Sequence, residues 1–150
     1  MDIDLVLAIA HHLAVFAVVG IVAAEFALLR PGIAGARLSQ LARIDSAYGL
    51  AAVLLVAAGV GRVFLGVNGA GYYLGNPIFW TKMALFVIVG LLSIQPTVAL
   101  LGWNKALKAD PDYAPPQREI AVSRRFIHLQ VGGLVLIPIF AAAMARGYGV

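Results

Sequence analysis

Four apolar segments, each long enough to cross a lipid bilayer, constrain the fold of this chain more than any other feature. They run from about residue 3 to 29, 45 to 65, 79 to 101 and 120 to 145. A transmembrane helix needs about 20 mostly apolar residues, whereas a strand is shorter and alternates apolar with polar positions. None of the segments alternates in that way. The sequence therefore predicts an all-α fold, an integral membrane four-helix bundle built from residues 1–150 as a single domain.

The composition supports lipid as the solvent. Hydrophobic residues make up 62% of the chain and charged residues only 12%, against about 25% charged in a typical soluble domain. The net charge of +4 does not indicate nucleic acid, because the basic residues flank apolar segments instead of forming patches with interleaved aromatics. Cysteine is absent, which excludes thiolate metal sites and iron–sulfur clusters. Membrane lipids are the expected partners.

The distribution of basic residues predicts the orientation of the helices. Cytoplasmic connections carry an excess of Lys and Arg, so the more basic side is placed inside and both termini outside. The N-terminal Asp2 and Asp4 fit an outer position, and they also differ from the positive start of a secretory signal, so we expect the first segment to be retained. The basic residues of the predicted inner side are Arg30, Arg37, Arg43, Lys105, Lys108, Arg118, Arg124 and Arg125.

Ionisable residues inside apolar segments are costly in lipid and point to function. Four of them fall at the predicted outer level, namely His11 and His12 in the first segment, Arg62 in the second and Lys82 in the third. We expect these residues to form one site. Adjacent helical residues point about 100° apart, so only one of the two histidines is expected to face it.

A second polar cluster is predicted at the inner level, formed by Glu25, Arg124 and His128. Arg124 and His128 are four residues apart and share a helix face. An unpaired buried carboxylate is unfavourable, so we expect Glu25 to face inward and pair with Arg43, Arg124 or His128.

The outer residues suit two kinds of cofactor. A b-type haem needs a nitrogen ligand, an apolar slot and cations for its propionates, which His11 or His12, Arg62 and Lys82 would provide. The other axial position would then be open, or filled by Lys82 or by a neighbouring subunit of a homo-oligomer. Copper is the alternative, because imidazole and thioether ligands suit that metal. Its candidate ligands are His11, His12, Met83 and Met144.

Purely structural roles remain open for the same residues. Arg62 and Lys82 can extend their charged ends to the headgroups while their stems stay in lipid. Arg124 would then anchor the topology, and His128 would make an interfacial hydrogen bond. In that case the protein is a cofactor-free accessory subunit. No residue is assigned a catalytic role.

The chain resembles a family of small bacterial four-helix membrane proteins of unknown function, over nearly its whole length. That resemblance implies a multi-pass protein of the bacterial inner (cytoplasmic) membrane and brings no activity. It rests on the segments EFALLRPG at 25–32, LARID at 41–45 with Tyr48 and Gly49, RVF at 62–64, YLGNPIFWTK at 73–82 and LSIQPT at 92–97.

A second resemblance is to the HemJ-type protoporphyrinogen IX oxidases, which are also four-helix proteins of about this length. It rests on a histidine near the start of the first helix, here His11 or His12, and on Lys82 opening the third helix before an apolar run. The resemblance implies a b-type haem and a haem-dependent membrane oxidoreductase. The chain departs from that family in Glu25 and Arg62 and in a first helix that is not rich in aromatics.

Overall fold

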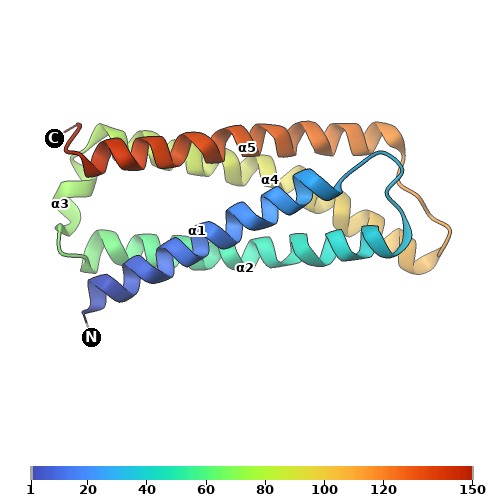
Figure 1. Cartoon of the computed structure of the whole chain (residues 1–150), viewed down its shortest axis with the longest axis horizontal. Helices are drawn as coiled ribbons and strands as arrows, with labels where there is room; N and C mark the ends of the chain where they lie inside the picture. The colour runs from blue at the N-terminus through green and yellow to red at the C-terminus, as the bar shows by residue number, and fades with distance from the viewer. Residues whose placement is uncertain (1, 150) are drawn as a thin grey trace.

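Five helices make up the part of the chain that the computed structural model describes, residues 2–149. They are α1 (Ile3–Leu28), α2 (Gly35–Leu65), the short α3 (Gly69–Leu74), α4 (Pro77–Ala109) and α5 (Gln117–Ala145). The four long helices are each apolar enough to cross a membrane, which confirms the four predicted spans. They lie side by side, with both chain ends and α3 at one end of the bundle, here called the terminal end (Figure 1). The connections α1–α2 and α4–α5 lie at the other end, the loop end.

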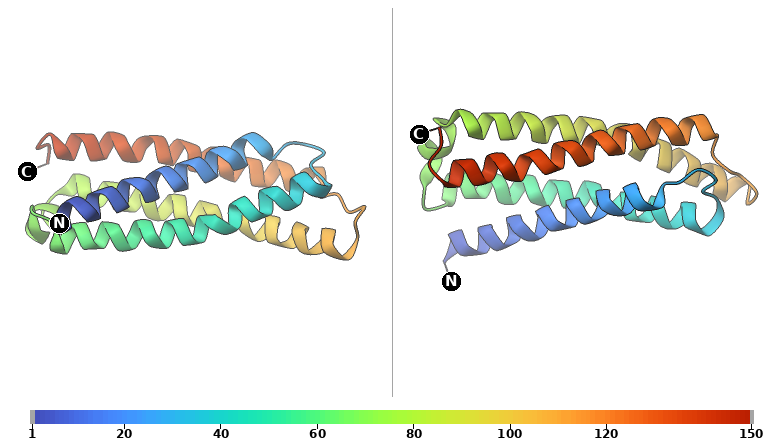
Figure 2. Two further views of the ribbon diagram at one scale, coloured as in Figure 1. Left: turned by 60° about the horizontal axis from the view of Figure 1, so that its bottom comes forward. Right: turned by 45° about the horizontal axis from the view of Figure 1, so that its top comes forward.

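The long helices form two antiparallel pairs. α1 packs mainly on α2, and α4 mainly on α5, while α2 also contacts α4 and joins the pairs (Figure 2). Glycines permit close approach within the pairs. A Cβ placed on Gly61 would lie 2.8 Å from Leu7 Cδ2 across α1 and α2, and one on Gly133 would lie 2.5 Å from Val89 Cγ2 across α4 and α5. Small residues at helix contacts are typical of packing in lipid.

The helices are longer at the loop end than the apolar segments predict. α2 begins at Gly35, ten residues before the expected start at Asp45, and α4 ends at Ala109 instead of near Leu101. At about 1.5 Å per residue α4 is about 50 Å long, against a hydrocarbon core of about 30 Å. The ten added residues of α2 form about three turns and are amphipathic, with Leu38 and Leu41 fully buried. A search for continuous apolar spans therefore misses it.

The terminal end is closed by α3, which lies between the second and third predicted apolar segments. Asn76 connects it to the rest of the bundle: its side-chain oxygen accepts from the backbone N–H of Ile78 at 2.8 Å and caps α4, which starts with Pro77. The Asn76 amide donates to the carbonyl of Tyr148 at 3.1 Å, and the Tyr72 hydroxyl donates to the carbonyl of Met144 at 3.0 Å. These bonds hold α3 against the end of α5.

Apolar and polar groups alternate along the bundle interior. An apolar cluster at the loop end contains Leu29, Leu38, Leu41, Leu100, Trp103 and Ile120. A middle cluster contains Ala14, Val18, Ala51 and Leu55, and a terminal cluster contains Val63, Tyr73, Phe79 and Met144. Buried polar side chains lie between them, and these are the candidate sites.

Candidate functional site

His11, Arg62 and Lys82, here called the basic cluster, are brought together between the middle and terminal apolar clusters. His11 on α1 is close enough to Arg62 on α2 and to Lys82 on α4 for their charges to interact, and Lys82 is similarly close to Arg62. The Lys82 ammonium also lies 5.5 Å from the centre of the Phe79 ring. Three helices therefore contribute to one site.

The basic cluster contains polar atoms that lack partners. His11 Nδ1 and Arg62 Nε are buried without a hydrogen-bond partner among the described residues. The Leu55 carbonyl is near the His11 ring, but the geometry falls short of a hydrogen bond. Gly59 faces the same ring, with its hypothetical Cβ 3.5 Å from His11 Cε1. Buried polar atoms are normally satisfied, so an imidazole nitrogen and a guanidinium nitrogen are left available to an acceptor or a metal.

His12 is placed elsewhere. Its side chain is exposed on the lipid-facing side of α1, and its Nδ1 lies 2.7 Å from the Ala8 carbonyl. The two rings are 6.0 Å apart and nearly perpendicular. Of the two candidate histidines, only His11 therefore faces the basic cluster, as the 100° offset of adjacent residues requires.

The four residues considered for copper lie in different surroundings. Met144 is buried in the terminal apolar cluster, and Met83 packs against it, while His12 faces outward. Within residues 2–149 no group of three or more His, Cys, Asp or Glu side chains is arranged to hold a metal ion.

Glu25 does not have the cationic partner expected for it. Its carboxyl group lies within hydrogen-bonding reach of Asp45 on α2, and both residues are only 2% exposed. Arg124 is turned to the end of α1, where its guanidinium donates to the Leu29 carbonyl at 3.2 Å. The expected pairing of Glu25 with Arg43, Arg124 or His128 is therefore wrong.

The reason lies in the rotation of α5. Its buried residues follow helical spacing through Ile120, Ser123, Ile127 and Gln130. His128 is exposed on the flank of that face, hydrogen-bonds through Nδ1 to the Arg124 carbonyl and packs its ring 4.8 Å from Phe26. The shared face of Arg124 and His128 was predicted, but it borders α1 at the surface. Gln130 marks the face that points inward.

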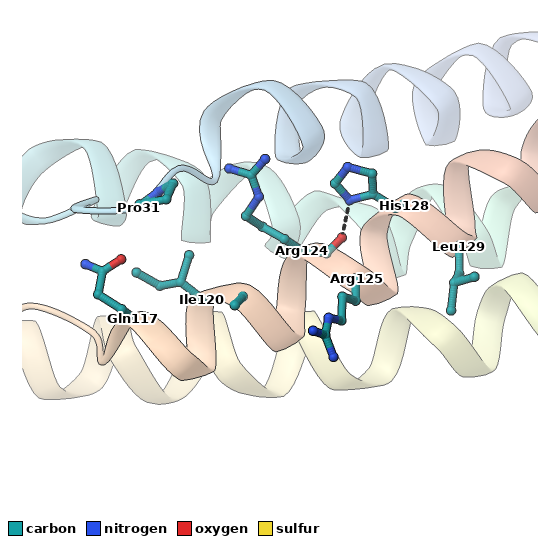
Figure 3. Close-up of a pocket in the computed structure, with 8 residues that line it drawn as sticks. Pro31, Gln117, Ile120, Arg124, Arg125, His128 and Leu129 are labelled. Atoms are coloured by element: carbon teal, nitrogen blue, oxygen red, sulfur yellow. Dashed lines mark hydrogen bonds between the residues drawn. The ribbon is translucent and has the colours of Figure 1, made fainter.

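A groove of about 620 Å³ runs along this flank of α5 at the loop end. Arg124 and His128 point toward α1, and Arg125 points to the opposite side, toward α4 (Figure 3). The groove is lined by Pro31, Gln117, Ile120, Ala121, Arg124, Arg125, His128 and Leu129.

A second polar contact at the loop end joins α4 to α5. The indole N–H of buried Trp103 donates to Glu119 Oε2 at 2.8 Å. In the neighbouring connection, burial raises the pKa of Tyr113 above its usual value, and the negative charge of Glu119 acts in the same direction. Neither contact was predicted, because nothing in the sequence pairs an aromatic ring with an acid on the next helix.

Substitution of the two adjacent arginines at the loop end, Arg124 and Arg125, is expected to have different effects on stability. Arg124→Ala removes the donor to the carbonyl of Leu29, the C-cap residue of α1, and a hydrogen bond to a charged group contributes about 1.5 kcal/mol or more. Arg125→Ala is the matched control, because Arg125 is exposed and points away from α1. We expect the first variant to unfold at a lower denaturant concentration and the second to match the wild type. Equal destabilisation of both would contradict a positional role for Arg124.

Comparison with known proteins agrees with this fold. No curated protein and no solved structure matches the chain. A family model described as predicted membrane protein (DUF2214) matches residues 3–149. The chain therefore belongs to the DUF2214 family of predicted membrane proteins.

Proposed function

We propose that the protein binds a tetrapyrrole, a b-type haem or a porphyrin, at the basic cluster and takes part in redox chemistry in the bacterial inner membrane. The observation that carries the proposal is the pair of buried, unpartnered nitrogens, His11 Nδ1 and Arg62 Nε, with Lys82 beside them. An imidazole nitrogen suits an axial position of haem iron, and two cations suit the two propionates. The resemblance to the HemJ-type oxidases points to the same ligand.

The residues have distinct roles in this proposal. His11 presents a neutral nitrogen toward the bundle interior, and Gly59 leaves one side of its ring free of a side chain. Arg62 and Lys82 neutralise the carboxylates of the ligand, because like charges inside lipid are unfavourable without a counter-ion. A bound haem would supply one-electron chemistry, and the surrounding apolar side chains would exclude water from it.

Porphyrin titration tests this placement directly, because the two tryptophans of the chain lie at opposite ends of α4. Trp80 is two residues before Lys82, whereas Trp103 is near the loop end. In a Trp103→Phe background, added haem should quench the fluorescence of Trp80 saturably. In a Trp80→Phe background the quenching of Trp103 should be weaker, because the ligand is farther away. Equal quenching of both, or none, would contradict the site, and copper bound to the purified protein would favour the alternative metal.

We also propose that both termini face the outer side of the membrane. The support is the excess of Lys and Arg at the loop end, which the positive-inside rule assigns to the cytoplasm. Reporter fusions at Ala36 and Ala109 should read as cytoplasmic. Fusions at Gly69 and at Val150, which lies outside the described residues, should read as external. A cytoplasmic C-terminus would reverse the orientation and place the basic cluster at the inner leaflet.

A further inference from the structure

Glu25 and Asp45, here called the acid pair, lie in the bundle interior well away from the basic cluster. Each of the two residues is only 2% exposed. The two carboxyl groups are within hydrogen-bonding reach of each other. Glu25 Oε1 and Asp45 Oδ2 are buried and find no donor among the described residues. Two ionised carboxylates cannot remain side by side in hydrocarbon without something positive between them.

The protein provides few of the donors that would be needed. The Thr97 hydroxyl on α4 donates to Asp45 Oδ1 at 2.8 Å, which leaves Oδ2 unsatisfied. The Tyr48 hydroxyl on α2 is directed to Ser93, and Ser93 donates to the Gly90 carbonyl at 2.6 Å. Thr97 therefore holds one oxygen of Asp45, and none of these neutral groups removes the charge of the acid pair.

The charged groups nearest the acid pair on the remaining helix are directed elsewhere. Arg124 of α5 donates to the Leu29 carbonyl, and the exposed His128 packs on Phe26. An independent feature of α5 points to the same layer: Gln130 is 0% exposed, and both polar atoms of its amide lack partners within residues 2–149. Because Gly133 lies against Val89 in the antiparallel pair, Gln130 is level with Ser93. A second unsatisfied polar group therefore faces the interior about one turn from the acid pair.

We infer that the acid pair is a proton-binding site inside the membrane, in which one proton is shared between Glu25 Oε1 and Asp45 Oδ2. A hydrogen-bonded carboxyl pair requires a hydrogen between its oxygens, and the shared proton removes one of the two buried charges. Tyr48 is close enough to both acids for their charges to act on its hydroxyl, and Gln130 is the next buried polar side chain along the interior. The inference does not depend on the tetrapyrrole proposal, because the acid pair and the basic cluster share no residue.

The site is closed in this structure. Toward the loop end it is covered by Leu29, Leu38 and Leu41, each 0% exposed. Toward the terminal end it is covered by Ala51 and Leu55 of the middle apolar cluster. A proton can therefore leave the acid pair only when the helices separate locally, as expected for an occluded site.

Infrared spectroscopy of the protein in lipid at neutral pH tests the inference. A protonated carboxylic acid gives a carbonyl stretching band that ionised carboxylates lack, and we expect this band in the wild type. Glu25→Gln and Asp45→Asn should each abolish it, because the amide then donates the hydrogen bond to the remaining carboxylate. Asp112→Asn is the matched control, since Asp112 is exposed in the connection before α5, and it should leave the band unchanged.

Isotope labelling makes the test independent of whether the variants fold. The chain contains two glutamates, Glu25 and Glu119, so ¹³C labelling of glutamate carboxyl groups should shift part of the band in the wild type, and Glu119→Gln should leave that shifted part in place. Absence of the band, or a band insensitive to both aspartate and glutamate labelling, would overturn the inference. A carboxylate band that instead changes when sodium and potassium are replaced by choline would show a bound metal cation and overturn the shared proton.

Discussion

Replacing His11 with alanine is expected to abolish the Soret absorbance of the protein expressed with ample haem. The His11 ring lies close to Arg62 and Lys82, and its Nδ1 has no hydrogen-bond partner in the described part of the chain. Removing the imidazole removes the nitrogen ligand that α1 presents to the basic cluster, and Lys82, which is proposed to pair with a propionate, would not replace it. The measurement is the absorbance ratio of haem to protein after purification.

His12→Ala is the matched control for this prediction. His12 has the same side chain at the neighbouring position, but it is exposed and bonded to the Ala8 carbonyl. It should retain the spectrum of the wild type. Arg62→Ala should weaken haem binding without abolishing it, because Lys82 still offers one cation to the propionates. A spectrum that survives the double substitution of His11 and His12 would contradict the site.

Trp103→Ala is expected to destabilise the protein by about 3–5 kcal/mol, the usual loss for removing a large buried aromatic side chain. Trp103 is 3% exposed within the apolar cluster at the loop end, and its indole N–H donates to Glu119. The substitution removes packing between α4 and α5 and leaves a cavity in the apolar cluster at the loop end. Unfolding in mixed detergent, followed by loss of helical circular dichroism, measures the effect.

Two further variants separate packing from hydrogen bonding at this position. Trp103→Phe keeps most of the ring and removes the donor to Glu119, so it should lose only about 1.5 kcal/mol. Trp80→Ala is the control for a tryptophan on the same helix, because Trp80 is 55% exposed. If Trp80→Ala destabilised the protein as much as Trp103→Ala, the loss in Trp103→Ala could not be assigned to packing in the apolar cluster at the loop end.

The spans were predictable from the sequence because continuous apolar runs of this length have one stable form in lipid. The helix ends at the loop end were not. Residues 35–44 are amphipathic and carry Arg37 and Arg43, so a criterion based on continuous apolar residues excludes them. Their apolar positions at Leu38 and Leu41 repeat at helical spacing, and an amphipathic pattern of this kind predicts a buried face. Reading that pattern would have extended the second helix.

The candidate site was predictable in composition but not in its contacts. The depth of His11, Arg62 and Lys82 along their helices followed from residue counting alone, and the offset of adjacent residues predicted that one histidine would face outward. The partner of Glu25 was not predictable from charge, because complementarity favours a cation and the structure presents Asp45. The rotation of α5 directs Arg124 to the Leu29 carbonyl and His128 to Phe26, and sequence spacing does not determine that rotation.

The absorption spectrum of the protein, purified in mild detergent from cells with ample haem, tests the central proposal most directly. We predict a coloured protein with a Soret band that remains with the polypeptide through size-exclusion chromatography and is lost in His11→Ala. A colourless wild-type protein, folded by circular dichroism and still unable to take up added haem, would contradict it.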